Sequence, residues 1–253
     1  MVLRLTKILV LVYLGFGAYL FFVQRSFMYY PVTEIHTDQV KSEILASGKH
    51  NLKIWSLNPG RDKAVIYFGG NAENVLYNAE DLTAALPAYS IYLVNYRGYG
   101  GSSGTPSEAA LYHDALNIFD HLQSRHQAIS AIGRSLGSSV TTYLASQRPL
   151  NRIVLATPFA SAVALAAEAY PVYPVDLLLQ DKYESISFVS RIDEPALFLI
   201  AADDLVIPLA HSLRLAKAFP AEQVQTVIIQ DSGHNSISGK ATYWKSISQF
   251  LSE

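Results

Sequence analysis

The sequence contains no cysteine among its 253 residues. This absence excludes disulfide bonds, thiolate zinc sites, thiolate-held iron–sulfur clusters and a cysteine nucleophile. Charged residues are also few, at 16%, and 19 Lys plus Arg against 21 Asp plus Glu give a net charge of −2. A balance so close to neutral lacks the basic surface that is typical of nucleic-acid-binding proteins. The hydrophobic fraction of 50% is too high for a disordered chain, and the length predicts one large domain or two small ones.

The N-terminal region holds a hydrophobic run, Ile8–Val23, without charged or strongly polar side chains. As a helix it would rise about 24 Å, and Leu5 and Phe27 extend its apolar surface toward the roughly 30 Å hydrocarbon core of a bilayer. We predict an uncleaved single-pass membrane anchor over residues 1–28. A cleaved signal peptide, with its small residues at Gly15–Ala18, and a buried or interfacial helix are the alternatives.

Basic residues on the two sides of this run bear on its orientation. Arg4 and Lys7 precede it together with the terminal amine, and Arg25 and Lys41 follow it. Because basic flanks favour the cytoplasmic side, this count slightly favours residues 29–253 on the non-cytoplasmic side, which is the periplasm in a bacterium.

Beyond the run, short apolar segments alternate with helical stretches. Six segments are typical of buried parallel strands: Ala64–Phe68, Ser90–Val94, Ala128–Ile132, Arg152–Ala156, Ala196–Ala201 and Val224–Ile229. Leu52–Leu57 is expected as an edge-type strand. Helices are expected over Glu73–Leu86, Ser107–Arg125, Leu136–Gln147, Leu209–Phe219 and Lys240–Leu251. This order predicts an α/β domain over residues 29–253, with a mostly parallel sheet, helices on both faces and a helical cap inserted at about 158–191.

The motif G-x-S-x-G occurs at Gly133-Arg134-Ser135-Leu136-Gly137, between a predicted strand and a predicted helix. That context is the one a nucleophile elbow requires, because the strained turn exposes the serine. Ser135 is therefore the candidate nucleophile, and the backbone N–H of Leu136 is a candidate oxyanion donor. The alternative interpretation is an ordinary turn between strand and helix.

A serine nucleophile needs a base and an acid later in the chain. Of the seven histidines, only His234 follows the last predicted strand in a loop; the others, including His211, are expected at the surface or in structural roles. Asp203 and Asp204 both follow the strand that should carry the acid, and the residues alone leave the two open. Asp231 is a third candidate, but it shares its loop with His234.

The loop Gly69–Ala72 follows the strand Ala64–Phe68. Consecutive glycines let backbone N–H groups approach a substrate closely, so the N–H of Asn71 is the candidate for the second oxyanion donor. A simple glycine turn is the alternative. This chemistry requires no metal and no organic cofactor.

Several stretches occur in one order along the chain: Tyr67–Asn74, Asn95–Gly100, Gly104–Glu108, Leu111–Asp114, Gly133–Gly137 and Gly233–Asn235. In this order they resemble the α/β-hydrolase superfamily. More narrowly, they resemble the membrane-anchored serine hydrolases of the α/β-hydrolase-domain-containing kind, some of which remove palmitate from protein cysteines. The resemblance implies the α/β-hydrolase fold.

The family pattern also bears on single residues. Its acid stands four residues before a proline, and Pro208 therefore favours Asp204 over Asp203. The usual histidine of the glycine loop is Gly69 here, so the side chain that anchors the loop is expected to be absent. The usual aspartate before Tyr-Arg-Gly is Asn95, a position expected to be structural. Arg97 is expected to bond to carbonyl groups at the sheet edge rather than to substrate.

Residues and resemblance together predict a serine hydrolase of carboxylic esters or thioesters that works through an acyl-enzyme. The predicted triad is Ser135, Asp204 and His234, with oxyanion donors on Leu136 and Asn71. An amidase or peptidase-type hydrolase and a non-catalytic binding protein of the same fold are the alternatives.

The expected substrate follows from the anchor and the apolar cap segment Ala160–Leu179. Both favour an acyl chain presented at a bilayer, so a small-molecule or lipid ester, or an acylated protein, is the expected partner. The membrane is the other expected partner, through the N-terminal helix, and no nucleic acid is expected.

Overall fold

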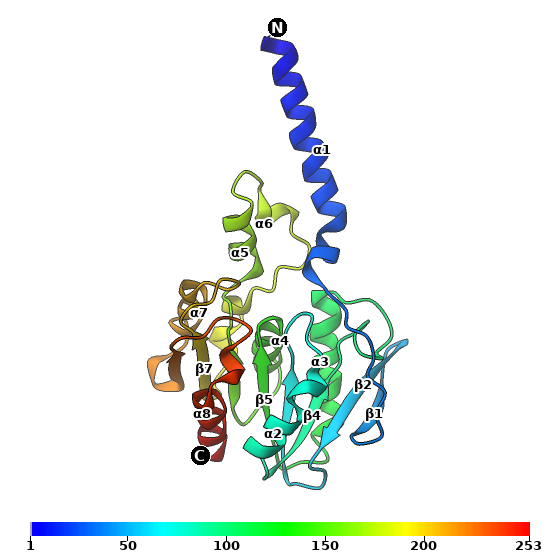
Figure 1. Ribbon diagram of the computed structural model, residues 1–253, viewed down its shortest axis with the longest axis vertical. Helices are drawn as coiled ribbons and strands as arrows, with labels where there is room; N and C mark the ends of the chain where they lie inside the picture. The colour runs from blue at the N-terminus through cyan, green and yellow to red at the C-terminus, as the bar shows by residue number, and fades with distance from the viewer. Residues whose placement is uncertain (1) are drawn as a thin grey trace.

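The computed structural model describes residues 2–253 and contains one sheet of eight strands in the order β1-β2-β4-β3-β5-β6-β7-β8 (Figure 1). The strands are β1 (Lys41–Ser47), β2 (His50–Leu57), β3 (Lys63–Phe68), β4 (Tyr89–Val94), β5 (Ala128–Arg134), β6 (Ile153–Ala156), β7 (Ala196–Ala201) and β8 (Val224–Ile229). β2 pairs antiparallel with β1 and with β4, and every other pairing is parallel. The predicted mostly parallel sheet is confirmed.

The helices are α1 (Val2–Met28), α2 (Ala79–Ala85), α3 (Glu108–Leu122), α4 (Leu136–Ala145), α5 (Ala162–Ala169), α6 (Val175–Leu178), α7 (Leu209–Ala216) and α8 (Ala241–Ser252). Of these, α2, α3, α4, α7 and α8 cover the two faces of the sheet. Because side chains alternate along a strand, Ile66 and Phe68 of β3 join a core with α3, α4 and α7, whereas Val65 and Tyr67 join a second core with α2 and α8. Each fully buried aliphatic side chain in these cores contributes about 1.5–3 kcal/mol.

Two strands differ from their predictions. Leu52–Leu57 was expected at an edge, but β2 is an inner strand, because β1 pairs along its whole length. β1 has mostly exposed or half-buried residues, so its sequence lacks a buried strand's apolar signal. The segment Val224–Ile229 was expected to be buried, but β8 forms the far edge of the sheet and only Ile229 is buried.

The helix predicted at Glu73–Leu86 is shorter in the structure. α2 begins at Ala79 and follows a 3₁₀ turn, Val75–Asn78, which the Asn74 side chain caps by accepting a hydrogen bond from Leu76 N–H. Asn and Asp side chains favour such local caps over helix interiors. Glu73 therefore lies in the loop before the turn, where its carboxylate is available to other groups.

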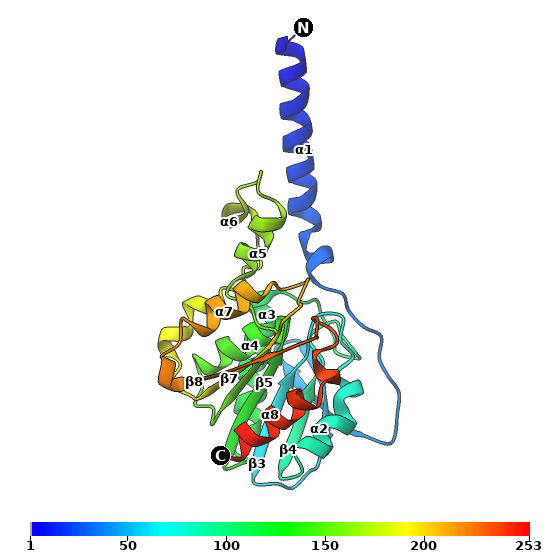
Figure 2. The same ribbon diagram turned by 60° about the vertical axis from the view of Figure 1, so that its left-hand side comes forward.

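α1 projects away from the sheet, and α5 and α6 rise beside its lower half (Figures 1 and 2). Its 27 residues contain no buried side chain, and its most apolar window has a mean hydropathy of 1.9. The alternative interpretation of this segment as a helix buried in the protein core is therefore wrong. By length and composition α1 is able to cross a membrane, properties that membrane anchors and signal sequences share.

The last turn of α1 is bonded to the part of the predicted cap that follows α6. The Arg25 guanidinium donates to both carboxylate oxygens of Asp181, at 2.8 and 3.1 Å. The hydroxyls of Tyr29 and Tyr183 are buried and lie 2.7 Å apart. The proposed division into residues 1–28 and 29–253 stays a prediction, and the Arg25–Asp181 ion pair crosses it.

Candidate active site

Ser135 lies at a sharp turn between β5 and α4. Its backbone has φ +51° and ψ −116°, a conformation that costs a non-glycine residue energy and that clusters at functional sites. The flanking glycines make the turn possible, because a Cβ on Gly133 would collide with the Gly137 carbonyl and one on Gly137 with the Phe68 carbonyl. The sequence Gly133–Gly137 therefore folds as the elbow that its motif indicates.

His234 lies between Ser135 and Asp204 at the C-terminal ends of the parallel strands. Its Nε2 is 2.9 Å from Ser135 Oγ, and its Nδ1 is 2.8 Å from Asp204 Oδ2. The three residues follow β5, β7 and β8, so three separate loops deliver them to one point. Asp203, by contrast, has an exposed side chain, and Asp231 is exposed in a turn at φ +51°. Among the three candidate acids, the structure brings Asp204 to the histidine.

The Asp204 side chain is 1% exposed, and its carboxylate accepts three hydrogen bonds. Oδ2 faces His234, and Oδ1 accepts from the N–H groups of Val206 and Ile207, each at 2.8 Å. Burial by itself raises the pKa of this carboxyl, but the hydrogen bonds from His234, Ile207 and Val206 outweigh burial and hold the pKa below its ordinary value. Asp204 is therefore an anion at neutral pH, fixed beside the imidazole.

The two candidate oxyanion donors are the backbone N–H groups of Leu136, which follows Ser135, and of Asn71, which follows Gly70. Leu136 is the first residue of α4, so its N–H has no carbonyl partner within the helix. The backbone of Gly70 packs against Ser135, since a Cβ built on Gly70 would lie 3.6 Å from Ser135 Cβ. Within residues 2–253, neither Leu136 N–H nor the next amide along that loop, Asn71 N–H, donates a hydrogen bond.

Glu73 anchors the glycine loop. Its Oε2 accepts from Gly70 N–H at 2.6 Å and from Arg134 at 3.3 Å, and its Oε1 accepts from Tyr67 OH at 2.6 Å and from Asn78 at 2.7 Å. The expectation that this loop lacks an anchoring side chain is therefore wrong.

Glu73 and its neighbour Val75 also explain the glycine at position 69. A Cβ on Gly69 would lie 2.7 Å from Val75 Cγ1 and 3.3 Å from Glu73 Cδ, so a larger residue requires both to move. Glu73 was expected inside a helix, so this role was not predicted. An acidic residue three positions after Gly70, in a loop that precedes a helix, was the available signal.

Asn71 is the second functional side chain that sequence reasoning missed. Its Nδ2 donates to the carbonyl of Met28 at 2.7 Å, and its Oδ1 accepts from Tyr30 N–H at 3.0 Å and from Tyr99 OH at 2.7 Å. The side chain thus fastens the loop to the segment that leaves α1.

Arg97 does not bond to carbonyl groups as predicted. Its Nε and Nη2 donate to the two carboxylate oxygens of Asp114, each at 2.6 Å, and Nη2 also reaches Ser47 Oγ at 3.3 Å. The bidentate pair ties the loop after β4 to α3 and β1, since a guanidinium matches a carboxylate better than single carbonyls. Asn95 is buried and packs against Gly100, where a Cβ would collide with its side-chain amide.

Ser135 and His234 open into a cavity of about 850 Å³. Its walls are mixed: polar side chains of Asn71, Glu73, Asn74, Asn78, Arg134 and Asn235 lie beside apolar surface that includes Tyr30 and Tyr77. The predicted cap, residues 158–191, contributes no lining residue among those described. The described residues 2–253 contain no cluster of three or more His, Asp or Glu side chains that would hold a metal ion.

Comparison with known proteins decides the family. The model of the family described as alpha/beta hydrolase fold matches residues 63–185. The chain belongs to the α/β-hydrolase family. It is 37% identical over 182 residues to the uncharacterized protein Rv2307c of Mycobacterium tuberculosis, covering 70% of this chain and 64% of that relative, so the match spans less than two thirds of the relative's length.

Two further proteins are similar to this α/β-hydrolase, one in sequence and one in structure. The alpha/beta hydrolase domain-containing protein WAV2 of Arabidopsis thaliana is 25% identical over 252 residues, which cover 88% of this chain and 82% of WAV2. The solved structure of the Pyrococcus furiosus esterase Pf2001 superposes with a TM-score of 0.73 at 15% identity, covering 88% of this chain and 98% of the esterase. At that identity, the likeness to the esterase shows the fold alone.

Proposed function

We propose that this α/β-hydrolase is a serine hydrolase that cleaves carboxylic ester or thioester bonds through an acyl-enzyme. One observation carries the proposal: His234 lies 2.9 Å from Ser135 Oγ and 2.8 Å from Asp204 Oδ2. These distances are within the hydrogen-bond reach that a nucleophile, a base and an orienting acid require.

In the first step His234 Nε2 takes the proton of Ser135 while Oγ attacks the carbonyl carbon of the substrate. The Asp204 carboxylate accepts from Nδ1–H, which fixes the imidazole and stabilises the imidazolium. The N–H groups of Leu136 and Asn71 bind the oxyanion, and each such donor lowers the barrier by about 2.7–4 kcal/mol.

Collapse of the tetrahedral intermediate breaks the bond to the leaving group, which takes its proton from His234. Water then attacks the acyl-enzyme, with His234 again as the base, and releases the acid and Ser135. The distances from the His234 ring to Ser135 Oγ and Asp204 Oδ2, 2.9 and 2.8 Å, support a reaction in which these three side chains do not have to rearrange.

We also propose that α1 is an uncleaved membrane anchor. Asp181 is 3% exposed, and its carboxylate pairs with Arg25 on the last turn of α1. Cleavage at Gly15–Ala18 would keep this pair but would remove Tyr13, which stacks on Tyr173 with ring centroids 4.6 Å apart and donates to the Val172 carbonyl at 2.8 Å. These contacts of Tyr13 support an uncleaved helix. The substrate would then be an acyl ester or thioester at a membrane surface, as the anchor predicts.

The test is hydrolysis of p-nitrophenyl butyrate and labelling by a fluorophosphonate probe, with the full-length chain in detergent. We expect Ser135→Ala to abolish both, and Ser146→Ala, at the half-buried C-terminal cap of α4, to leave both unchanged. Equal labelling of the wild type and Ser135→Ala contradicts a Ser135 nucleophile. Labelling without hydrolysis of any ester or thioester points instead to an amide substrate, and absence of both points to a non-catalytic binding protein.

A further inference from the structure

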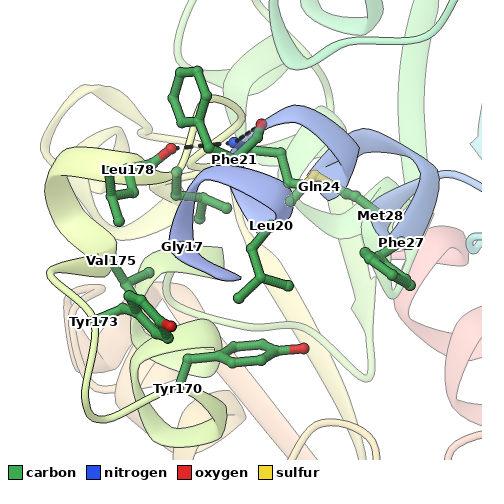
Figure 3. Close-up of a pocket in the computed structure, with 11 residues that line it drawn as sticks. Gly17, Leu20, Phe21, Gln24, Phe27, Met28, Tyr170, Tyr173, Val175 and Leu178 are labelled. Carbon is green, nitrogen blue, oxygen red and sulfur yellow. Dashed lines mark hydrogen bonds between the residues drawn. The ribbon is translucent and has the colours of Figure 1, made fainter. Parts of the chain in front are cut away.

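A second hollow lies between α1 and the cap, and Figure 3 shows its lining residues. Its volume is about 210 Å³. One wall comes from α1 and the other from the cap around α5 and α6. The α1 wall consists of Gly17, Leu20, Phe21, Gln24, Phe27 and Met28, and the cap wall of Tyr170, Tyr173, Val175, Leu178 and Leu179. We call this hollow the α1–cap groove.

The groove offers hydrocarbon and aromatic surface and few hydrogen bonds. The amide of Gln24, its most polar side chain, already donates to Phe21 and Leu178 carbonyls and accepts from Gln180 N–H. The hydroxyl of Tyr173 donates to the Tyr13 carbonyl. Because these polar atoms are already paired, a polar ligand would lose hydrogen bonds to water on entering the groove. The groove therefore selects an apolar ligand.

The shape of the groove suits a chain. Its α1 wall runs from Gly17 to Met28, which is about 16 Å at the 1.5 Å rise of a helix. The Tyr173 ring closes one end by packing against Gly17, where a Cβ would lie 2.9 Å from the ring. Leu20 points across the groove toward Tyr170 (Figure 3).

The surroundings of the groove supply such a ligand. α1 is apolar and unburied, and the cap beside it also exposes large apolar side chains, with Val172 69% and Leu177 78% exposed. An exposed apolar surface of this kind, on a helix long enough to cross a bilayer, marks contact with lipid. The cap tip therefore enters the same apolar layer as α1, and the groove between them opens to acyl chains.

The lower end of the groove adjoins the cavity that holds Ser135. Met28 lines the groove, its carbonyl accepts a hydrogen bond from Asn71, and Asn71 lines the cavity with Ser135. Tyr30, two residues beyond Met28, lines that cavity as well. The apolar groove and a cavity with several polar side chains thus lie on two sides of the hydrogen bond between Met28 and Asn71. Together they match a molecule with an apolar chain on one side of a carbonyl and a polar group on the other.

We propose that the α1–cap groove binds the acyl chain of a membrane-resident ester or thioester, whose carbonyl reaches Ser135 and whose polar leaving group occupies the cavity lined by Asn74 and Arg134. The transmembrane helix is then one wall of the substrate site as well as an anchor. This proposal rests on the proposed hydrolase function, and it accounts for a cap that is apolar although it contributes nothing to the walls of the cavity.

The first test measures chain-length preference of the full-length chain in phosphatidylcholine vesicles. Leu20→Trp fills the groove, and Leu11→Trp adds the same bulk on an exposed part of α1 that lines no groove. We expect Leu20→Trp to lower kcat/KM for p-nitrophenyl palmitate by about tenfold or more and for p-nitrophenyl acetate by less than about twofold. We expect Leu11→Trp to change neither. Wild-type activity of Leu20→Trp on the palmitate ester overturns the proposal, whereas absence of acetate hydrolysis in every variant contradicts the hydrolase function itself.

The second test needs no turnover. The Ser135→Ala chain in the same vesicles is irradiated with a palmitoyl ester that carries a diazirine at the end of its chain. Crosslinks on peptides that contain Leu20 or Tyr170, lost in the variant that also carries Leu20→Trp, support the proposal. Crosslinks spread evenly along α1 overturn it. Crosslinking of a diazirine phosphatidylcholine there, with the ester excluded, shows a structural lipid in the groove and overturns it as well.

Discussion

The side-chain amide of Asn71 donates a hydrogen bond of 2.7 Å to the backbone carbonyl of Met28, the last residue of α1. Tyr30 N–H returns a hydrogen bond of 3.0 Å to the same side chain. Asn71 also carries the backbone N–H that we assign to the oxyanion. The end of the proposed membrane helix and the proposed oxyanion donor are therefore one hydrogen-bonded unit.

Asn71→Ala tests that unit. The substitution keeps the backbone N–H but removes the bonds to Met28 and Tyr30, so the loop is free to shift. Complete loss of an oxyanion donor costs about 10²–10³ in kcat, and we expect a misplaced donor to cost about tenfold in kcat with little change in KM. Steady-state kinetics on a short ester measures both constants.

The matched control is Asn117→Ala on α3, which removes an amide that bonds to Ser47 on β1. We expect this control to keep the wild-type kcat. If Asn71→Ala has the wild-type kcat, the side chain does not position the donor.

Asp204→Asn tests the acid. Asparagine keeps the shape of the side chain but lacks the charge that orients the His234 ring and stabilises its protonated form. Loss of that charge from a Ser-His-Asp triad lowers kcat by about 10⁴. We expect a fall of this order for Asp204→Asn and an unchanged kcat for Asp203→Asn, whose carboxylate is exposed. The reverse ranking contradicts the assignment.

Glu73→Ala tests the anchor of the glycine loop. Four hydrogen bonds are lost, and the Arg134 guanidinium, 13% exposed, keeps no carboxylate partner. Breaking a largely buried pair costs about 3 kcal/mol, which corresponds to a fall in melting temperature of roughly 6–12 °C. Thermal unfolding followed by circular dichroism measures this. A melting temperature within error of the wild type contradicts the anchoring role, and Glu80→Ala, in the first turn of α2, is the surface control.

The sequence predicted the parts of the site whose signals are local. Ser135 lies within a motif that itself builds the turn, and His234 follows a strand recognisable by its apolar run. The choice of Asp204 required evidence beyond the local sequence, because Asp203 and Asp204 follow the same strand. The position of Pro208 in the family pattern favoured Asp204, the residue that the structure places beside His234.

The parts that sequence reasoning missed depend on distant partners. Asn71 reaches Met28, 43 positions away, and Arg134 pairs with Glu73, 61 positions away. Nothing in the local sequence around either residue indicates such a partner. β1 was missed for a related reason, because its pairing with β2 leaves most of its residues exposed or half-buried and so without an apolar pattern.

The pH dependence of stability tests the electrostatics of Asp204. Its hydrogen bonds from His234, Ile207 and Val206 hold its pKa in the folded protein below the value of about 3.9 expected when unfolded. A carboxyl whose pKa falls on folding stabilises the fold above the unfolded pKa, and this stabilisation is lost as the pH falls through the folded pKa. Melting temperatures of the wild type and Asp204→Asn should therefore differ most above about pH 5 and converge toward about pH 3. A difference that grows as the pH falls contradicts the lowered pKa, and Asp203→Asn should track the wild type throughout.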